Sequence, residues 1–343
     1  MTVIKLSFKP KQLTKKLLSG LKDRSYDVVV GRFGLVEDGP MTLEAIGQQY
    51  GITRERVRQI EAAALASIRK SDSYQEEMAA FEELKEIIKS AGGVVNEEEI
   101  LEMLSKDPVT KNHIYFFLVL GDQFEKHKED ENFAPRWSVD KETSDTVHGA
   151  LDEIYKKIGD NELIPESEMI SRFLSYVKDI NEEYRDQEVI KRWLNVSKNI
   201  GKNPLGEYGK SESPAVNCRG VKDYAYLVMR KHGSPLHFKE VAKAINEHFG
   251  KKTHVATCHN ELIKDNRFVL VGRGMYALKE WGYETGVVRD VISRIIKKEG
   301  PLSKDDIIDR VLKERYLKKN TIVVNLQNNK YFKKNKQGLY TVA

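Results

Sequence analysis

Little cysteine and no long apolar run occur in this sequence, and each absence excludes a class of protein. Only Cys218 and Cys258 occur among 343 residues, so there is no disulfide framework, and we expect two buried, unpaired thiols in a reducing cytoplasm. No apolar stretch approaches the roughly 18 residues that a membrane span needs. Residues 1–16 mix basic with apolar side chains and show no small-residue cleavage site, which argues against a signal peptide. The sequence therefore predicts a cytoplasmic protein without membrane contact.

Motifs for catalysis and for metal binding are also missing. His254, Cys258 and His259 lie close in sequence, but no CxxC motif or further ligand accompanies them, so we interpret them as packing residues of a helix. Residues 272–274 (Gly-Arg-Gly) lack the strand-to-helix context of a phosphate loop. No nucleophile–base pair and no pair of catalytic carboxylates stands out. We therefore expect no enzymatic activity, no metal and no cofactor.

Charge is distributed unevenly along the chain, although the net charge is only +5. Residues 1–71 hold 13 Lys/Arg against 7 Asp/Glu, a net charge of +6. Residues 72–215 hold 18 against 32, a net of −14, and residues 216–343 hold 26 against 13, a net of +13. The two ends therefore suit a polyanion, whereas the middle suits a basic protein surface or keeps nearby segments away from DNA.

Residues 42–70 (TLEAIGQQYGITRERVRQIEAAALASIRK) predict two helices joined by a tight turn. Gly51 stands where the turn needs a positive φ, and Thr53 is a suitable N-cap for the second helix. Gly47 is the small residue that lets the two helices approach closely. The inward residues of the second helix recur at helical spacing and are Val57, Ile60, Ala64 and Ile68. A further turn is predicted at residues 37–40.

The outer face of the second helix carries side chains suited to reading bases. They are Arg54, Glu55, Arg58 and Gln59. Arginine can pair bidentately with guanine and glutamine with adenine, and glutamate can accept a hydrogen bond from cytosine. The alternative interpretation is a solvated helix face that carries ion pairs between successive turns.

Residues 17–70 resemble region 4 of the primary sigma factors of bacterial RNA polymerase, through the words GRFGL, TLEAIG and TRERVRQIEAAAL. The resemblance implies recognition of a −35-type promoter element and base reading by Arg54, Glu55, Arg58 and Gln59. It also implies contacts to the DNA backbone by Thr42, Leu43, Glu44, Thr53 and Arg56. Region 4 of that family additionally grips the polymerase flap. No match to the promoter-melting sigma region is found, so a complete sigma factor is not implied.

An internal repeat follows residue 71, and its units share the winged-helix order of helix, turn, two helices and hairpin. The four openings are KSAGGVVNEEEILEML from Lys89, KIGDNELIPESEMISRFL from Lys157, RKHGSPLHFKEVAKAIN from Arg230 and KKEGPLSKDDIIDRVL from Lys297. The last two units end in a hairpin with Gly-x-Tyr, and the second unit shows the pattern least. The predicted domains are residues 1–71, 72–143, 144–215, 216–283 and 284–343.

Residues 224–282 resemble the winged-helix domain known as HARE-HTH, which also forms the N-terminal part of the delta subunit of RNA polymerase. The matching words are GSPLH from Gly233, DNRF from Asp265 and GRGMYAL from Gly272. The resemblance implies a winged helix that binds either polymerase or DNA.

Basic residues surround the last two predicted hairpins. Arg267 and Arg273 flank the third hairpin, and Lys330, Lys333, Lys334 and Lys336 surround the last one. A wing often lies along phosphate or in the minor groove, so these residues are candidate DNA contacts. The alternative is that they are solubilising charges at an edge strand.

Together these patterns predict a mainly α protein with small β wings, in which a sigma region 4 helix-turn-helix precedes tandem winged-helix domains. The predicted function is that of a non-enzymatic, nucleoid-associated bacterial transcription factor. It would bind double-stranded DNA at a promoter-like sequence and engage DNA or RNA polymerase through its winged helices. The alternative is a delta-like accessory protein of RNA polymerase that acts mainly through protein–protein contacts.

Overall fold

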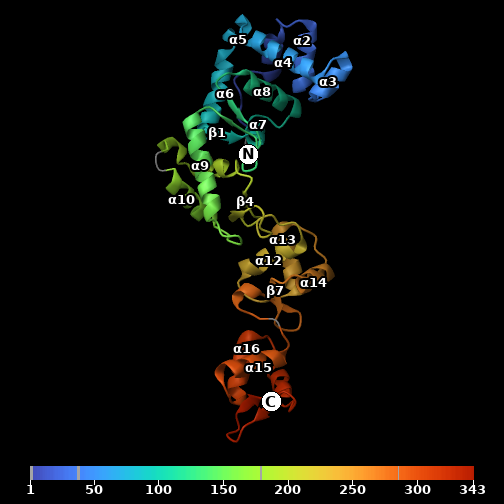
Figure 1. Ribbon diagram of the computed structural model, residues 1–343, viewed down its shortest axis with the longest axis vertical. Helices are drawn as coiled ribbons and strands as arrows, with labels where there is room; N and C mark the ends of the chain where they lie inside the picture. The colour runs from blue at the N-terminus through green and yellow to red at the C-terminus, as the bar shows by residue number, and fades with distance from the viewer. Residues whose placement is uncertain (1–2, 37–38, 178–179, 285) are drawn as a thin grey trace. The chain divides into compact units, whose positions relative to one another are not determined.

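The computed structural model describes residues 3–36, 39–177, 180–284 and 286–343. The chain is mainly α-helical with small antiparallel sheets, as the sequence predicts. It forms two compact units: unit 1 holds residues 1–202 and 207–212, and unit 2 holds residues 203–206 and 213–343 (Figure 1). Within the described ranges, no helix has the length and apolar character that a membrane crossing needs.

Unit 1 begins with the helix-turn-helix region. Its elements are α1 (Pro10–Leu18), α2 (Asp23–Phe33), α3 (Leu43–Tyr50) and α4 (Arg54–Arg69), followed by α5 (Asp72–Glu76). A proline opens α1, where its missing N–H costs no hydrogen bond. Ser71 caps α5 by accepting a hydrogen bond from the N–H of Tyr74. The predicted turn at residues 37–40 lies partly outside the described residues.

The described residues form four modules with the element order of a winged helix. Module 1 comprises α6 (Met78–Ser90), β1 (Val94–Asn96), α7 (Glu97–Leu104), α8 (Pro108–Leu120), β2 (Glu125–His127) and β3 (Arg136–Ser138). Module 2 comprises α9 (Lys141–Lys157), α10 (Glu166–Tyr176), the 3-10 helix η1 (Glu182–Tyr184), α11 (Gln187–Leu194), β4 (Ile200–Lys202) and β5 (Tyr208–Lys210). Module 3 comprises α12 (Val221–His232), β6 (Leu236–His237), α13 (Phe238–Phe249), α14 (Val255–Lys264), β7 (Phe268–Leu270), β8 (Met275–Leu278) and the 3-10 helix η2 (Lys279–Trp281). Module 4 comprises α15 (Val288–Glu299), α16 (Lys304–Glu314), α17 (Lys319–Leu326), β9 (Phe332–Lys334) and β10 (Tyr340–Val342).

One cross-strand pair recurs in every module. An apolar residue before the second long helix lies opposite an aromatic residue in the last strand of the hairpin. The pairs are Val95–Trp137, Ile164–Tyr208, Leu236–Tyr276 and Leu302–Tyr340. The four aromatic residues are between 1% and 8% exposed, so each closes the core of its module. Module 2 has this pair too, although its hairpin is the hardest to recognise in the sequence.

The helix-turn-helix region and module 1 share one hydrophobic core within unit 1. The ring of Phe33 at the end of α2 lies 5.2 Å from that of Phe116 in α8, in an edge-to-face arrangement. Phe117 of α8 meets Phe81 of α6 and Phe8 of the N-terminal arm. The predicted boundary at residues 71 and 72 therefore separates two parts that pack together continuously.

Hydrogen bonds at the end of α4 reinforce this shared core. The guanidinium group of Arg69 donates to the carbonyl oxygens of Leu120 (2.8 Å) and Val119 (3.0 Å), and it forms an ion pair with Asp122 at 3.1 Å. These carbonyls lie at the C-terminal end of α8, which has no intrahelical partner for them. Because Arg69 is the last residue of α4, the bonds attach α4 directly to module 1.

Module 2 packs on module 1 through its third long helix, α11. The indole Nε1 of Trp193 donates to the carbonyl oxygen of Gly92 at 3.0 Å, and a Cβ on Gly92 would lie only 2.7 Å from the same indole. Arg192 lies 3.5 Å from Glu99 of α7. A glycine is therefore required where the two modules approach most closely.

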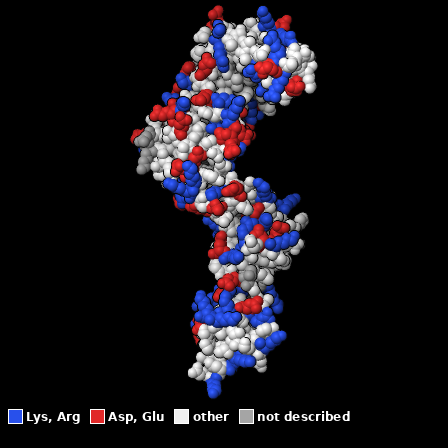
Figure 2. Space-filling model, viewed as in Figure 1, with Lys and Arg blue, Asp and Glu red and all other residues white. Residues whose placement is uncertain are grey.

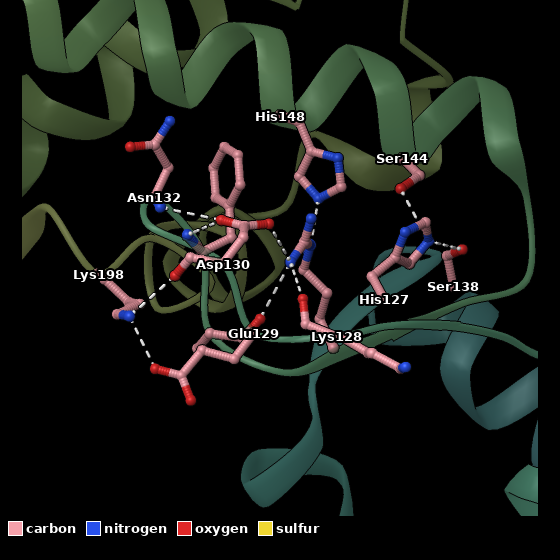
Figure 3. A network of polar contacts seen from close by, with 12 residues as sticks. His127, Lys128, Glu129, Asp130, Asn132, Ser138, Ser144, His148 and Lys198 are labelled. Carbon is pink, nitrogen blue, oxygen red and sulfur yellow. Dashed lines mark hydrogen bonds and ion pairs between the residues drawn. The ribbon is translucent and has the colours of Figure 1, made fainter.

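Polar side chains fill the contact between the wing of module 1 and α9 (Figure 3). Arg136 is 5% exposed, and its Nε donates to Nε2 of His148 at 2.6 Å. Its Nη1 donates to the carbonyl oxygen of Lys128 and to Asp130, both at 3.3 Å. Desolvation, together with the nearby Arg136 cation, lowers the pKa of His148 from 6.5 to about 4. His148 is therefore a neutral acceptor in the folded protein.

In unit 2, the wing of module 3 is joined to module 4. Gly272 and Tyr316 form a parallel bridge, and the N–H of Tyr316 donates to the carbonyl oxygen of Val271 at 2.8 Å. A Cβ on Gly272 would lie 2.6 Å from the carbonyl oxygen of Tyr316. Arg315, which is 3% exposed, donates to the carbonyl oxygen of Glu284.

We predict that Phe33→Ala lowers the free energy of unfolding by about 3–5 kcal/mol, because it leaves a cavity against α8. Hydrogen exchange should then accelerate in α8 of module 1 as well as in α2. Tyr26→Ala is the matched control, since Tyr26 lies on the same helix but is 42% exposed. Faster exchange confined to residues 17–70 would show that the two parts unfold separately.

We also predict that unit 1 loses stability as the pH falls from 6.5 to 4. The unfolded chain binds a proton at His148 near pH 6.5, whereas the folded chain binds it only near pH 4. The unfolded state is therefore favoured on acidification, by up to about 3 kcal/mol for this group. The free energy of unfolding, measured by denaturation at several pH values in this range, should depend less on pH in His148→Gln, which retains an acceptor for Arg136. The pH dependence of the free energy of unfolding should be unchanged in His232→Gln, whose side chain is exposed. An equal pH slope in the wild type and His148→Gln would contradict this.

Candidate nucleic-acid interface

Two capped helices and a glycine turn shape the helix-turn-helix. Thr42 accepts a hydrogen bond from the N–H of Ala45 (3.1 Å), and Thr53 accepts one from the N–H of Arg56 (3.2 Å). Gly51 has a φ of 61° and ends α3. These contacts confirm the predicted turn and the predicted N-cap.

Gly47 lies at the point where α3 meets the turn. Its carbonyl oxygen accepts a hydrogen bond from the N–H of Ile52 at 2.9 Å, and the residue is buried. A Cβ at this position would lie 2.7 Å from the carbonyl oxygen of Ile52, which is backbone and cannot rotate away. The predicted need for a small residue is thus met, and it fixes the angle at which α4 leaves α3.

The predicted reading residues Arg54, Glu55, Arg58 and Gln59 are all exposed on α4. Arg58 forms a bidentate ion pair with Glu55, with Nε–Oε2 and Nη2–Oε1 distances of 2.9 and 2.7 Å. This hydrogen bonding lowers the pKa of the Glu55 carboxyl. Arg56 Nη1 donates to Oε1 of Gln59 at 3.1 Å. The face is therefore ordered by its own polar contacts, without any part in the core.

Several residues predicted to contact the DNA backbone come together beside the turn. Glu44, Thr53 and Arg56 line a surface depression of ≈ 520 Å³, together with Gly47, Gln48, Gly51 and Ile52. Thr42 is exposed at the start of α3, and Leu43 is half-buried against the core of this region. Gln48 was not singled out in the sequence. Its exposed place in α3, one turn before Ile52, is the signal that locates it.

The third long helix of each winged module is either largely buried or largely exposed. It corresponds to the second helix of a helix-turn-helix pair, which is the helix that enters a DNA groove. In module 1, six residues of α8 are buried, and in module 2, four of the eight residues of α11 are buried. In modules 3 and 4, by contrast, the third long helix has only two buried residues. They are Cys258 and Leu262 in α14, and Ile322 and Leu326 in α17. Within each unit, α8 and α11 are therefore used for packing, and α14 and α17 keep an exposed face.

Arg267, one of the predicted wing contacts, is held in ion pairs within module 3. Its guanidinium group pairs with Asp223 at 2.8 Å and with Asp265 at 2.7 Å, and Asp223 is 3% exposed. A buried carboxylate needs its cationic partner, so Arg267 has a structural role between α12 and β7, and we leave it out of the interface. Arg273 is exposed on the turn that also contacts module 4. Lys330, Lys333, Lys334 and Lys336 are exposed around β9 and the last turn.

The remaining notable side chains of module 3 are used for packing. Cys258 is buried and Cys218 is half-buried, and both are free thiols. Their burial raises the pKa of each thiol to about 11. The ring of His259 stacks on Phe238 with centroids 4.2 Å apart.

Residues 17–70 match sigma-70, region 4. Residues 219–281 match HARE-HTH, a helix-turn-helix domain named in part after ASXL and restriction endonuclease. The RNA polymerase sigma factor RpoD of Neisseria gonorrhoeae is 45% identical over 58 residues, which cover 17% of this chain and 9% of that relative. Both resemblances seen in the sequence are thus confirmed. The matched domains are DNA-binding and transcription-related, and the chain spans a small part of the relative.

We predict that Gly47→Ala destabilises the helix-turn-helix by about 1–3 kcal/mol and weakens duplex binding, because the new methyl group forces α3 and α4 apart. Gly149→Ala is the control: Gly149 lies within α9 and has no neighbouring atom within 4 Å of an added Cβ. That change should be neutral or stabilising by about 0.5–1 kcal/mol. Thermal denaturation and duplex binding of both full-length variants give the comparison. Equal behaviour would contradict the proposed role of Gly47.

Proposed function

We propose that this protein binds duplex DNA at a promoter-like, −35-type sequence by placing α4 in the major groove. The observation that carries this proposal is the exposed Arg/Glu/Gln face of α4, which lies inside the segment that matches sigma-70, region 4. In this proposal, Arg54, Glu55, Arg58 and Gln59 read base edges. Thr42, Leu43, Glu44, Thr53 and Arg56 contact the backbone.

The contacts among the proposed reading residues are compatible with base recognition. Glu55 occupies Nε and one Nη2 hydrogen of Arg58, so the remaining donors of the guanidinium stay available to a guanine. A solvated helix face would show the same ion pair. The family match, rather than this pair, favours base recognition over that alternative.

A second candidate function is binding of RNA polymerase by module 3. The supporting observation is apolar exposure, since Val255, Ile263 and Leu270 are 40%, 62% and 54% exposed on α14 and β7. In the helix-turn-helix region, by contrast, the inward faces of α1 and α2 pack against module 1. A protein partner that bound these same inward faces would need to compete with α8. Capture of core polymerase by the full chain, and its loss in Ile263→Asp, would support this second function.

We predict that Arg54→Ala and Gln59→Ala each relax the preference at one base pair and cost about 1–3 kcal/mol on the selected site. The preferred duplex should first be selected from a randomised pool with the full chain, and both variants should then be titrated against it. Lys15→Ala is the control, because it removes an exposed charge from α1. A full chain that binds selected and scrambled duplexes equally would contradict base reading.

A further inference from the structure

In module 4 the arginines and the lysines differ in their contacts. Residues 286–343 are all described and contain ten lysines, four arginines and six acidic residues. Every arginine is engaged inside the module or its entry segment. Arg289 pairs with Asp290, Arg294 with Glu284 and Glu314, Arg310 with Glu299 and Asp306, and Arg315 donates to a backbone carbonyl.

The lysines of module 4 are used differently. All ten are exposed, and no ion pair to any of them occurs in the described part of the chain. The arginines already occupy four of the six acidic residues, which leaves Asp305 and Asp309. Ten ammonium groups without an ion pair are therefore present with two carboxylates that no arginine holds, and two of the ten, those of Lys330 and Lys334, lie over the rings of Tyr331 and Tyr340. On the visible face of the C-terminal end in Figure 2, Lys and Arg atoms are more extensive than Asp and Glu atoms.

The acidic middle of the chain shows the opposite arrangement. Nine of the thirteen described lysines of residues 72–215 form ion pairs with carboxylates. A lysine on a protein surface thus has a partner where carboxylates are plentiful. The lysines of module 4 form no ion pair, and arginines hold four of the six carboxylates of this module.

Lysines of module 4 lie on both elements that face DNA in the winged-helix plan, the third helix and the wing. Lys318 and Lys319 stand at the start of α17, which keeps its outer face exposed. Lys333 and Lys334 project from β9, opposite Thr341 and Tyr340 of β10, and Lys336 lies in the turn between the strands. Cations on the recognition helix and on the wing are placed to meet phosphates on either side of a groove.

We propose that module 4 is a sequence-independent clamp for the phosphate backbone of double-stranded DNA, built from lysines alone. The proposal extends the proposed function, because the clamp adds affinity to a site that α4 selects. A lysine ammonium is a compact point charge that attracts phosphate without the fork geometry that lets arginine identify guanine. Each guanidinium group of module 4 already has a polar partner within the module or its entry segment, whereas no lysine of the module has an ion pair, so the lysines are the cations that we assign to phosphate. Its binding energy comes from the release of counterions.

The test compares two full-length triple variants that remove the same charge. Lys333→Gln, Lys334→Gln and Lys336→Gln form the wing variant. Lys89→Gln, Lys128→Gln and Lys141→Gln form the control, since these three lysines are exposed, lie in the acidic middle and have no ion pair among the described residues. Both are titrated against a scrambled duplex at several salt concentrations.

The wing variant should bind the scrambled duplex about tenfold or more weakly, and its slope of log affinity against log salt should fall by about 2–3, since each phosphate contact contributes about 0.9. The control should match the wild type. An unchanged slope in the wing variant overturns the proposal. So does wild-type binding to phosphatidylglycerol vesicles in preference to DNA, which would make these lysines a lipid-binding surface.

The same titrations separate this proposal from the proposed function. If the clamp is correct, the wing variant keeps the wild-type ratio of affinities for the selected and scrambled duplexes. A wild type that shows no such ratio but does show the wing-dependent salt slope would remove the sequence-reading role of α4 and leave the clamp in place.

Discussion

Packing of α8 between two neighbours determines the organisation of unit 1. Phe116 contacts Phe33 of the helix-turn-helix region, and Phe117 contacts Phe81 of α6, so neighbouring residues of one helix join two parts of the chain in one core. Each aromatic side chain buries about 150–250 Å², which makes such contacts dominant in a small domain. Because α4 is bonded to the end of α8 through Arg69, its direction relative to module 1 is fixed. The exposed face of α4 therefore belongs to a helix that is packed with module 1 and hydrogen-bonded to it.

The same winged-helix plan serves two purposes in this chain. In unit 1 the third helix of each module is a packing element, and the surrounding surface is acidic. In unit 2 the third helices keep exposed faces, and the surrounding sequence is basic. Charge and exposure thus change together, which is the expected outcome if only some modules meet a polyanion. Fold alone would have assigned all of them the same role.

Local sequence was sufficient to predict the helix-turn-helix, its cap and its glycines, because hydrogen bonds within a few residues determine them. The Gly-x-Tyr motifs were likewise sufficient to predict two hairpins, because a tight turn depends on residues that are close in sequence. The fusion with module 1 depends on contacts between residues 33 and 116, which no local pattern encodes. One signal was present: residues 114–120 (IYFFLVL) are apolar all round, which is typical of a helix buried on more than one side. The role of Arg267 was likewise hidden, since Asp223 lies 44 residues earlier in the chain.

The positions of the three tryptophans determine which parts of the molecule tryptophan fluorescence can report on. Trp137 closes the core of module 1 and Trp193 fills the contact between modules 1 and 2, and both are almost fully buried. Trp281 is half-buried beside the module 3 sheet, and the sequence of module 4 contains no tryptophan. Indole emission therefore reports two sites in unit 1 at short wavelengths and one partly hydrated site in unit 2. Events confined to the C-terminal module leave no direct indole signal, so an indole introduced there would be seen against a background that comes entirely from elsewhere.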